Sequence, residues 1–228
     1  MRERIIIALD VPEADQARRL IEQLEGLVSF YKVGLELYTA AGREFVRELV
    51  ARGLNVFLDL KLYDIGETVK RAVRQVAALG VRLLTVHGSG PIMRAAVEGR
   101  QGAPLKLLGV TVLTSFDEED LADLGYPTSV RELVRLRARK ACEAGLDGLI
   151  CSPLEVAELR PIVGPDRLLI TPGVRSAGVE LGDQKRVATP GEAIRQGADY
   201  VVVGRQVTRS PDPRAEVMRI LEEIETIA

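Results

Sequence analysis

Residues 54–68 read LNVFLDLKLYDIGET, an apolar run that ends in closely spaced charges. The first part, LNVFLDL (54–60), is apolar at nearly every position and does not alternate between apolar and polar residues. Continuous apolar runs of this length are typical of parallel strands that are buried on both faces. The stretch therefore predicts a buried parallel strand whose end carries Asp59, Lys61 and Asp64.

Similar apolar runs recur along the chain and are separated by longer amphipathic stretches. The expected strands are residues 4–9, 29–34, 54–60, 81–87, 105–113, 146–152, 167–171 and 199–204. The expected helices are residues 13–26, 41–53, 67–80, 129–145, 189–197 and 212–228. Alternating strands and helices of this number predict a (β/α)8 TIM barrel, formed as a single domain by residues 1–228. A doubly wound open sheet is the alternative, because periodicity does not show whether a sheet closes.

Several helix ends carry their own local signals. Gly53, Gly80, Gly145 and Gly197 stand where a residue in the left-handed conformation is expected to end a helix. Thr189 is a candidate N-cap, because Pro190 follows it at the first helical position. The longest irregular stretches are 114–128 and 173–189, and both are expected to follow strands on the face of the barrel that carries active sites.

The composition excludes several classes of protein. Hydrophobic residues make up 46% and charged residues 28%, as in soluble globular proteins, and the formal net charge of −2 predicts no nucleic-acid partner. The apolar stretch near the N-terminus is too short for a signal peptide, and no stretch is long enough to cross a membrane. Cys142 and Cys151 have no CxxC spacing and there is one histidine, so we expect buried thiols in a cytoplasmic protein and no metal site.

Charged residues end three successive strands of the predicted barrel. Asp59 and Lys61 are two residues apart in a strand and should therefore point to the same side. Lys32 lies near the end of the second expected strand and Asp10 follows the first. These groups should meet at the C-terminal mouth of the barrel, where active sites lie. The alternative is a structural network of salt bridges that closes the barrel.

The residue types at this mouth favour one kind of chemistry. The chain offers no serine or cysteine nucleophile with a histidine base, and we interpret the lone His87 as a hydrogen-bonded packing residue. A lysine held between carboxylates is favoured in its protonated form, which makes it a proton donor. A neighbouring carboxylate can repel a substrate anion. Together these groups suit the loss of CO2 followed by protonation of the carbanion.

A second group of residues predicts a phosphate site. Gly204 and Arg205 follow the eighth expected strand, and a glycine allows a ligand to approach the backbone closely. The segment TPGVRSAGVELGDQKR (171–186) follows the seventh strand and contributes Arg175. Loops after the last two strands of such barrels often bind phosphate. Each piece taken singly could also be a solvated surface loop.

Seven segments in this order resemble the orotidine 5′-phosphate decarboxylase family, whose members catalyse the last step of UMP biosynthesis. The segments are ALD (8–10), YKVGLEL (31–37), DLKLYDIGET (59–68), VTVLTS (110–115), TPGVR (171–175), GDQKR (182–186) and VVVGR (201–205). The resemblance covers nearly the whole chain. Ser176 departs from it, since this family usually has a proline there.

The resemblance implies roles for individual residues. Lys61 would protonate C6 of orotidine 5′-phosphate, Asp59 would lie against the departing carboxylate, and Lys32 and Asp64 would complete the catalytic array. Asp64 and Thr68 would enter the neighbouring site of a homodimer. The expected substrate-binding residues are Asp10, Lys32, Thr68, Thr114, Ser115, Pro172, Arg175, Gln184, Gly204 and Arg205. Neither a metal nor an organic cofactor is implied.

Two other functions remain open from the sequence. Sugar-phosphate enzymes such as 3-keto-gulonate 6-phosphate decarboxylase and hexulose-phosphate synthase share the DxKxxD pattern, but they use Mg²⁺ and typically have an acid where Lys32 stands. A non-catalytic binder of nucleotide phosphates is the second alternative, although a binder gains little from a carboxylate that faces an anionic ligand.

Overall fold

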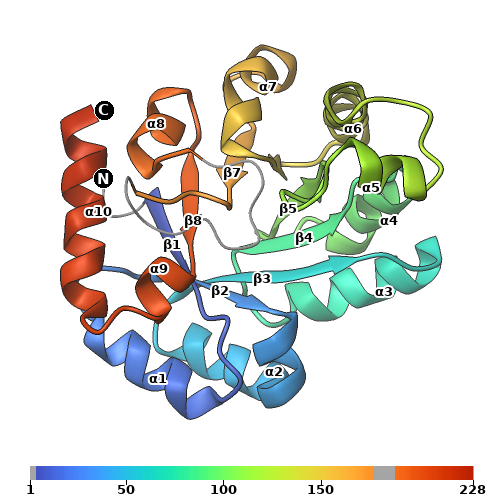
Figure 1. The fold of residues 1–228 in the computed structure, drawn as a ribbon. Helices are drawn as coiled ribbons and strands as arrows, with labels where there is room; N and C mark the ends of the chain where they lie inside the picture. Colours follow the sequence, from blue (N-terminus) through green and yellow to red (C-terminus); the bar gives the residue numbers. More distant parts are fainter. Residues whose placement is uncertain (1–3, 177–187, 228) are drawn as a thin grey trace.

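The computed structural model describes residues 4–176 and 188–227, so the GDQKR segment and Gln184 lie outside the described residues. Parallel strands pair in chain order, and β1 also pairs with β8, which closes the sheet into a barrel (Figure 1). The strands are β1 (Ile5–Ala8), β2 (Phe30–Gly34), β3 (Asn55–Leu62), β4 (Leu83–His87), β5 (Lys106–Val110), β6 (Gly148–Ile150), β7 (Leu168–Thr171) and β8 (Tyr200–Val203). The TIM-barrel prediction is confirmed, and the open sheet is excluded.

Helices surround the barrel (Figure 1). Their bounds are α1 (Ala14–Gln23), α2 (Leu35–Ala51), α3 (Gly66–Ala77), α4 (Gly90–Arg100), α5 (Glu118–Asp123), α6 (Val130–Ala144), α7 (Val156–Val163), α8 (Pro190–Arg195), α9 (Arg205–Thr208) and α10 (Pro213–Ile227), with a 3₁₀ turn η2 (Pro153–Glu155) before α7. The last helix, α10, packs against α8 and α1 and so joins the two ends of the barrel wall.

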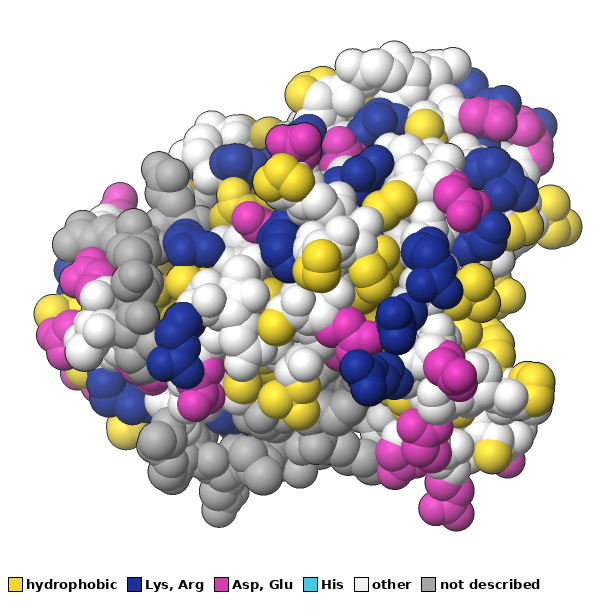
Figure 2. Space-filling model, turned by 90° about the horizontal axis from the view of Figure 1, so that it is seen from above, with side chains coloured by type: hydrophobic (Ala, Val, Ile, Leu, Met, Phe, Trp, Pro, Cys, Tyr) yellow, Lys and Arg dark blue, Asp and Glu magenta, His cyan; other side chains and the backbone are white. Residues whose placement is uncertain are grey.

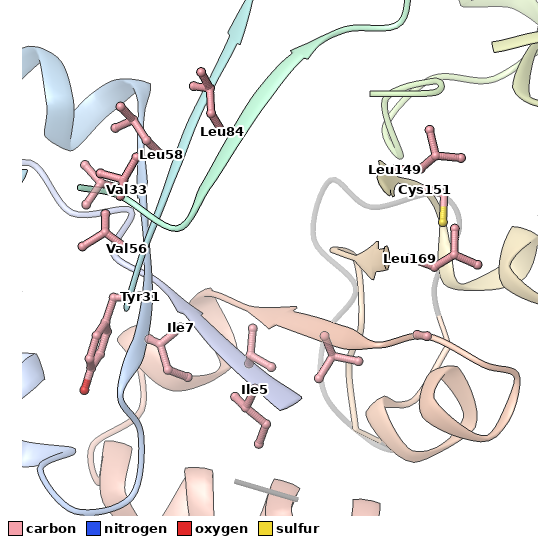
Figure 3. Close-up of a cluster of buried hydrophobic side chains, with 14 of the residues drawn as sticks. Ile5, Ile7, Tyr31, Val33, Val56, Leu58, Leu84, Leu149, Cys151 and Leu169 are labelled. Carbon is pink, nitrogen blue, oxygen red and sulfur yellow. The ribbon is translucent and has the colours of Figure 1, made fainter. Parts of the chain in front are cut away.

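Both faces of the strands are buried, as their continuous apolar runs predict. Alternate residues point into the barrel and form an inner apolar cluster made of Ile6, Ala8, Phe30, Phe57, Leu83, Leu108, Val110, Ile150, Ile170 and Val202. The residues between them pack outward with the apolar faces of the helices, and Figure 3 shows part of this outer cluster around Ile7, Tyr31 and Leu58. The outer cluster holds the helices in place, while the inner one fills the barrel below the mouth.

The predicted helix ends are confirmed. Gly53, Gly80, Gly145 and Gly197 have φ values of 75°, 77°, 80° and 106°, all in the left-handed region. Thr189 caps α8: its hydroxyl accepts a hydrogen bond from the Glu192 amide, and the Glu192 carboxylate accepts one from the Thr189 amide. These local signals identify where helices stop and start without reference to the barrel.

Two expectations about the β5 side of the barrel are wrong. The strand expected over 105–113 ends at Val110, because its neighbour β6 ends at Ile150 and offers no partner beyond that point. The stretch 114–128 is not irregular throughout, because α5 lies within it. The helix α5 begins with a capping box in which the Asp117 side chain and the Asp120 side chain each accept from the other residue's amide.

The surface has the mixed charge expected from the sequence. Seen from above, Lys and Arg side chains are interspersed with Asp and Glu side chains over the described part of this face (Figure 2). Among the described residues, no helix combines the length and the apolar character needed to cross a bilayer. Both cysteines are thiols, as predicted. Cys151 is buried, whereas Cys142, which was also expected to be buried, is only partly so.

Candidate active site

The inside of the barrel changes from apolar to charged near the C-terminal ends of the strands. In β2 and β3 the inward positions are Phe30 and Phe57, and two residues later they are Lys32 and Asp59. Both charged side chains are buried, each residue being 9% exposed. The strand alternation that places phenylalanines in the barrel floor therefore places a cation and an anion directly above them.

These charges form a chain of ion pairs. The Lys32 Nζ atom lies 2.8 Å from Oδ1 of Asp10 and 3.6 Å from Oδ2 of Asp59. The Lys61 Nζ atom donates to both carboxylate oxygens of Asp59, each at 2.9 Å. The sequence prediction that Asp10, Lys32, Asp59 and Lys61 meet at one mouth is confirmed, with acids and lysines alternating.

Asp59 stays ionised although it is buried. Burial raises the pKa of a carboxyl group, but the positive charges of Lys32 and Lys61 oppose that effect for Asp59. Hydrogen bonds from Lys61 and Thr85 add to the opposition, and the pKa of Asp59 ends below its ordinary value. The site therefore presents a fixed negative charge beside a lysine ammonium.

Lys61 reaches Asp59 by a different backbone route from the one predicted. Its φ of +46° is in the left-handed region, and the β3–β4 register shifts between Leu58 and Leu62. Regular alternation thus fails at Lys61, although the predicted meeting of its side chain with Asp59 is correct. A left-handed, non-glycine residue is uncommon, and sequence periodicity gives no sign of it.

Sequence reasoning missed Thr85. It is fully buried on β4, its Oγ1 accepts a hydrogen bond from the Lys61 amide at 2.9 Å, and it donates one to Oδ1 of Asp59 at 2.8 Å. The signal was present in LLTVH (83–87), where a polar residue interrupts an apolar run two positions after the inward-facing Leu83.

A cavity of about 290 Å³ opens above the charged layer. Its lining combines that layer with loops that follow β5, β7 and β8. Of the predicted site residues, it brings together Asp10, Lys32, Asp59, Lys61, Thr114, Ser115, Pro172, Arg175, Gly204 and Arg205. An apolar wall that the sequence analysis did not assign to the site completes it, formed by Ala8, Val110, Val112, Leu113, Ile150 and Val202.

Two predicted residues stand outside the lining of this cavity. Asp64 and Thr68 are exposed at the β3–α3 junction, and Oδ1 of Asp64 accepts a hydrogen bond from the Ile65 amide at 2.6 Å. The flanking Tyr63 and Ile65 are large apolar residues that are 67% and 76% exposed. Within one chain, Asp64 and Thr68 therefore lie on the surface and do not line the cavity.

The side of the cavity formed by β7 and β8 is basic. Arg175 is buried after β7, and its amide donates to the Ala188 carbonyl oxygen at 3.0 Å. Arg205 begins α9 directly after Gly204. Ser176, which stands where the resemblance predicts a proline, is hydrogen-bonded to Gln206. The Ser176 amide donates to the Gln206 side chain, and the Gln206 amide group donates to Oγ of Ser176 at 2.9 Å.

His87 packs at the end of β4, outside the ion-pair chain. Its ring stacks on that of Tyr63 with centroids 4.3 Å apart. Burial lowers the pKa of His87, and the charge of Arg137 lowers it further. Within the described residues, its Nδ1 atom is buried without a hydrogen-bond partner. The stacking agrees with the interpretation of His87 as a packing residue, whereas the hydrogen bond expected of it is not made at Nδ1 within the described residues.

Residues 4–176 and 188–227 contain no cluster of three or more His, Cys, Asp or Glu side chains arranged to hold a metal ion. The described cavity instead offers a lysine ammonium against a buried carboxylate at one side and two arginines at the other. Such an arrangement can hold a dianion by one end while a fixed electrostatic field acts at the other end.

Comparisons with known proteins agree with this geometry. Residues 3–220 match the family described as "Orotidine 5'-phosphate decarboxylase / HUMPS family". The orotidine 5′-phosphate decarboxylase of Rhodopseudomonas palustris (strain BisA53) is 53% identical over 223 residues, which cover 98% of this chain and 95% of the relative. That of Methylobacterium nodulans is also 53% identical, over 98% of this chain and 96% of the relative. A crystal structure of orotidine 5′-phosphate decarboxylase from Lactobacillus acidophilus superposes with a TM-score of 0.86 at 34% identity, covering 97% of this chain and 99% of that one.

Proposed function

Because the chain belongs to the orotidine 5′-phosphate decarboxylase family and is a carboxy-lyase, we propose that it converts orotidine 5′-phosphate to UMP and CO2 in de novo pyrimidine biosynthesis. The observation that supports this reaction best is the contact of the Lys61 ammonium with both oxygens of the buried Asp59. The proposal includes no metal and no organic cofactor. Both cysteines are thiols, and we place the enzyme in the cytoplasm.

In the proposed reaction, the bond between C6 and the substrate carboxylate breaks. CO2 leaves, and the electron pair stays on C6. The Lys61 ammonium then donates its proton to C6, which gives UMP and a neutral amine that solvent reprotonates. Asp59 lies against the departing carboxylate, and the two negative charges repel each other. The repulsion is weaker in the transition state, because the negative charge of the substrate moves from its carboxylate towards C6. Lys61 stabilises the charge that develops at C6.

The rest of the cavity fits the rest of the substrate. Arg175, Gly204 and Arg205 hold the phosphate together with Gln184, which lies outside the described residues. Asp10 and Lys32 bind the ribose hydroxyls, whereas Thr114 and Ser115 contact the edge of the pyrimidine and Pro172 lies beside them. The apolar wall of the cavity suits the flat face of the base. Phosphate binding is remote from C6 and supplies binding energy that lowers the barrier there.

The proposal includes a homodimer in which Asp64 and Thr68 serve the neighbouring site. Its support is the exposure of Tyr63 and Ile65 on either side of Asp64, because large apolar side chains gathered on a surface are typical of an interface. A two-fold axis near this segment would give each subunit's charged layer the Asp64 of the other subunit. The catalytic array would then be Lys32, Asp59, Lys61 and the partner subunit's Asp64.

The direct test is to incubate the purified protein with orotidine 5′-phosphate and follow the pyrimidine absorbance, with and without excess EDTA. We expect full conversion to UMP in both. Loss of turnover in EDTA would favour the metal-dependent sugar-phosphate enzymes. No spectral change in either sample would favour the non-catalytic binder.

The proton-donor role is tested by Lys61→Ala. General acid catalysis and electrostatic stabilisation together make a loss in kcat of about 10⁴-fold or more the expected result. Circular dichroism should show an unchanged fold, because the Lys61 side chain is 34% exposed and lies at the mouth of the barrel. A variant with substantial remaining turnover would refute this role.

The phosphate role is tested by Arg205→Ala. This change should raise KM for orotidine 5′-phosphate and leave the much slower reaction of orotidine, which lacks the phosphate, nearly unchanged. Equal losses on both substrates would show that Arg205 does not bind the phosphate.

A further inference from the structure

Thr85 connects the two groups on which the proposed chemistry depends. It is fully buried, and its position on β4 is two residues beyond the inward-facing Leu83, so it lies in the same layer of the barrel as Asp59. Its single hydroxyl makes two bonds: it accepts from the Lys61 amide at 2.9 Å and donates to Oδ1 of Asp59 at 2.8 Å. The hydroxyl therefore uses its one donor position and one of its two acceptor positions within the site.

The backbone at Lys61 explains why a hydroxyl is needed there. Leu58 pairs with Leu84 and Leu62 with Val86, so the chain between them advances four residues on β3 against two on β4. Lys61 lies in this irregular segment with a φ of +46°, a conformation that side chains disfavour. The Lys61 amide has turned out of the regular sheet pairing, and the Thr85 hydroxyl takes the place of a backbone carbonyl as its acceptor.

We propose that Thr85 is a positioning residue for the decarboxylation: its hydroxyl fixes the backbone that carries the Lys61 ammonium and, at the same time, one oxygen of the Asp59 carboxylate. This inference rests on the proposed function, because it assigns Thr85 a role in that reaction. The Lys61 ammonium and the Asp59 carboxylate are thus held at their separation before substrate binds, and these two groups need not reorganise during turnover. The hydroxyl also supports the charged form of Asp59, as the lowered pKa of that carboxyl indicates.

The test compares Thr85→Val and Thr85→Ser with Thr111→Val. Valine has the shape of threonine without the hydroxyl, and serine keeps the hydroxyl. Thr111 is a matched control on the same side of the barrel: it is also fully buried, and its hydroxyl donates only to the Ile150 carbonyl oxygen, which also accepts from the Thr111 amide. Its loss therefore removes a buried hydroxyl without affecting Lys61 or Asp59.

We expect Thr85→Val to lower kcat by about 10- to 100-fold, with KM changed less than about threefold, because the misplaced groups act on the transition state. Thr85→Ser should restore kcat to within about threefold of the unchanged protein, and Thr111→Val should match it. The acid limb of the kcat profile should move to higher pH in Thr85→Val. A kcat for Thr85→Val equal to that of Thr111→Val, or no rescue by serine, would overturn the inference. If the valine protein does not fold, Thr85→Ala is compared with Thr85→Ser by the same criteria.

A second measurement separates this inference from the proposed function. Hydrogen exchange of the Lys61 amide, followed by NMR without substrate, should be at least about tenfold faster in Thr85→Val and unchanged in Thr111→Val. If the unchanged protein does not decarboxylate orotidine 5′-phosphate, the proposed function fails, and the exchange result still decides whether Thr85 holds Lys61. If the unchanged protein is active but exchange and kcat are the same in Thr85→Val, the positioning role alone is refuted.

Discussion

Gly34 shows at the scale of one residue how closely the charges are packed. A Cβ atom at this position would lie 2.9 Å from both Oδ1 of Asp10 and Nζ of Lys32. The glycine therefore leaves room for the ion pair between them, which a larger residue would displace. Its φ is not in the left-handed region, so the requirement for glycine comes from space and not from backbone conformation.

Gly34→Ala should lower kcat/KM by roughly tenfold or more, because displacement of Lys32 also disturbs Asp59. The fold should persist, since both obstructing atoms are the ends of flexible side chains. Steady-state kinetics and the thermal midpoint would separate these effects. Gly90→Ala is the control, because its nearest contact would be at 3.4 Å; equal kinetic losses in both variants would contradict this explanation.

His87 should make stability depend on pH. Its pKa in the folded protein is below the ordinary value of about 6.5. Between these two values the unfolded chain binds a proton that the folded protein does not, so the free energy of unfolding falls as pH drops below about 6.5. Above that range His87 is neutral in both the folded and the unfolded state, so it does not make the free energy of unfolding depend on pH.

The measurement is urea unfolding of the unchanged protein and of His87→Asn at several values between about pH 7.5 and pH 5. The stability advantage of the unchanged protein should shrink as the pH falls. A constant difference over this range would show that the folded and unfolded states bind the His87 proton equally well.

The side-chain positions that could be predicted from the sequence followed from the alternation of inward and outward residues along a strand. Lys32 and Asp59 occupy inward positions that their apolar neighbours define, so their meeting could be read from spacing. The left-handed backbone of Lys61 could not, because it depends on a register shift between β3 and β4 that no single strand records. The inward position of Thr85 could be read from LLTVH (83–87), but its hydrogen bond with the Lys61 amide could not, because that bond depends on the shift.

At the scale of elements, one arginine joins the helix α7 to the N-terminal ends of β7 and β8. The Arg160 guanidinium donates to the carbonyl oxygens of Gly164, Arg167 and Gly197 and, at 2.6 Å, to the Asp199 carboxylate. It satisfies backbone acceptors from the loops that lead into both strands. This end of a barrel contributes to stability and lies opposite the active-site face.

Arg160→Met should lower the free energy of unfolding by about 2–3 kcal/mol, because it leaves partly buried acceptors and one carboxylate without their donor. The value of kcat should not change at a temperature where both proteins are folded. Arg131→Met is the matched control: the Arg131 side chain is 73% exposed in its ion pair with Glu158, and the expected cost is at most about 0.5 kcal/mol. Urea unfolding at one protein concentration would measure both, and equal costs would contradict the role of Arg160.

The bounds of the elements could be predicted where local signals were strong. Glycine ends and the Thr189 cap gave the limits of helices correctly. The end of β5 could not be predicted, because it is set by the short partner strand β6 and not by its own apolar sequence. The helix α5 is not among the helices predicted from the sequence, although Asp117 and Asp120 form a recognisable capping box at its start.

At the scale of the whole molecule, the proposed dimer places one subunit's Asp64 beside the other's Lys61. A mixture of two inactive proteins tests this directly. Equal amounts of Lys61→Ala and Asp64→Ala, allowed to exchange subunits, should recover about a quarter of the activity of the unchanged enzyme, since half of the dimers then contain one intact site.

The controls are each variant alone and the mixture before subunit exchange, all of which should have only residual activity. An exchanged mixture no more active than its components would show that Asp64 serves the site of its own subunit, or that no such dimer forms. Sedimentation of the same samples would distinguish these two explanations.

The closed ring of strands has a consequence for how this protein can fail. An open sheet can fray from an edge strand and let crowded charges drift apart, but a barrel whose β1 pairs with β8 has no such edge. Mutual repulsion or a lost counter-ion at the mouth can relax only through rotation of a side chain or rupture of the entire ring. Substitutions at the mouth should therefore give either an inactive but well-folded protein or a protein that unfolds cooperatively, with few partly unfolded states between them.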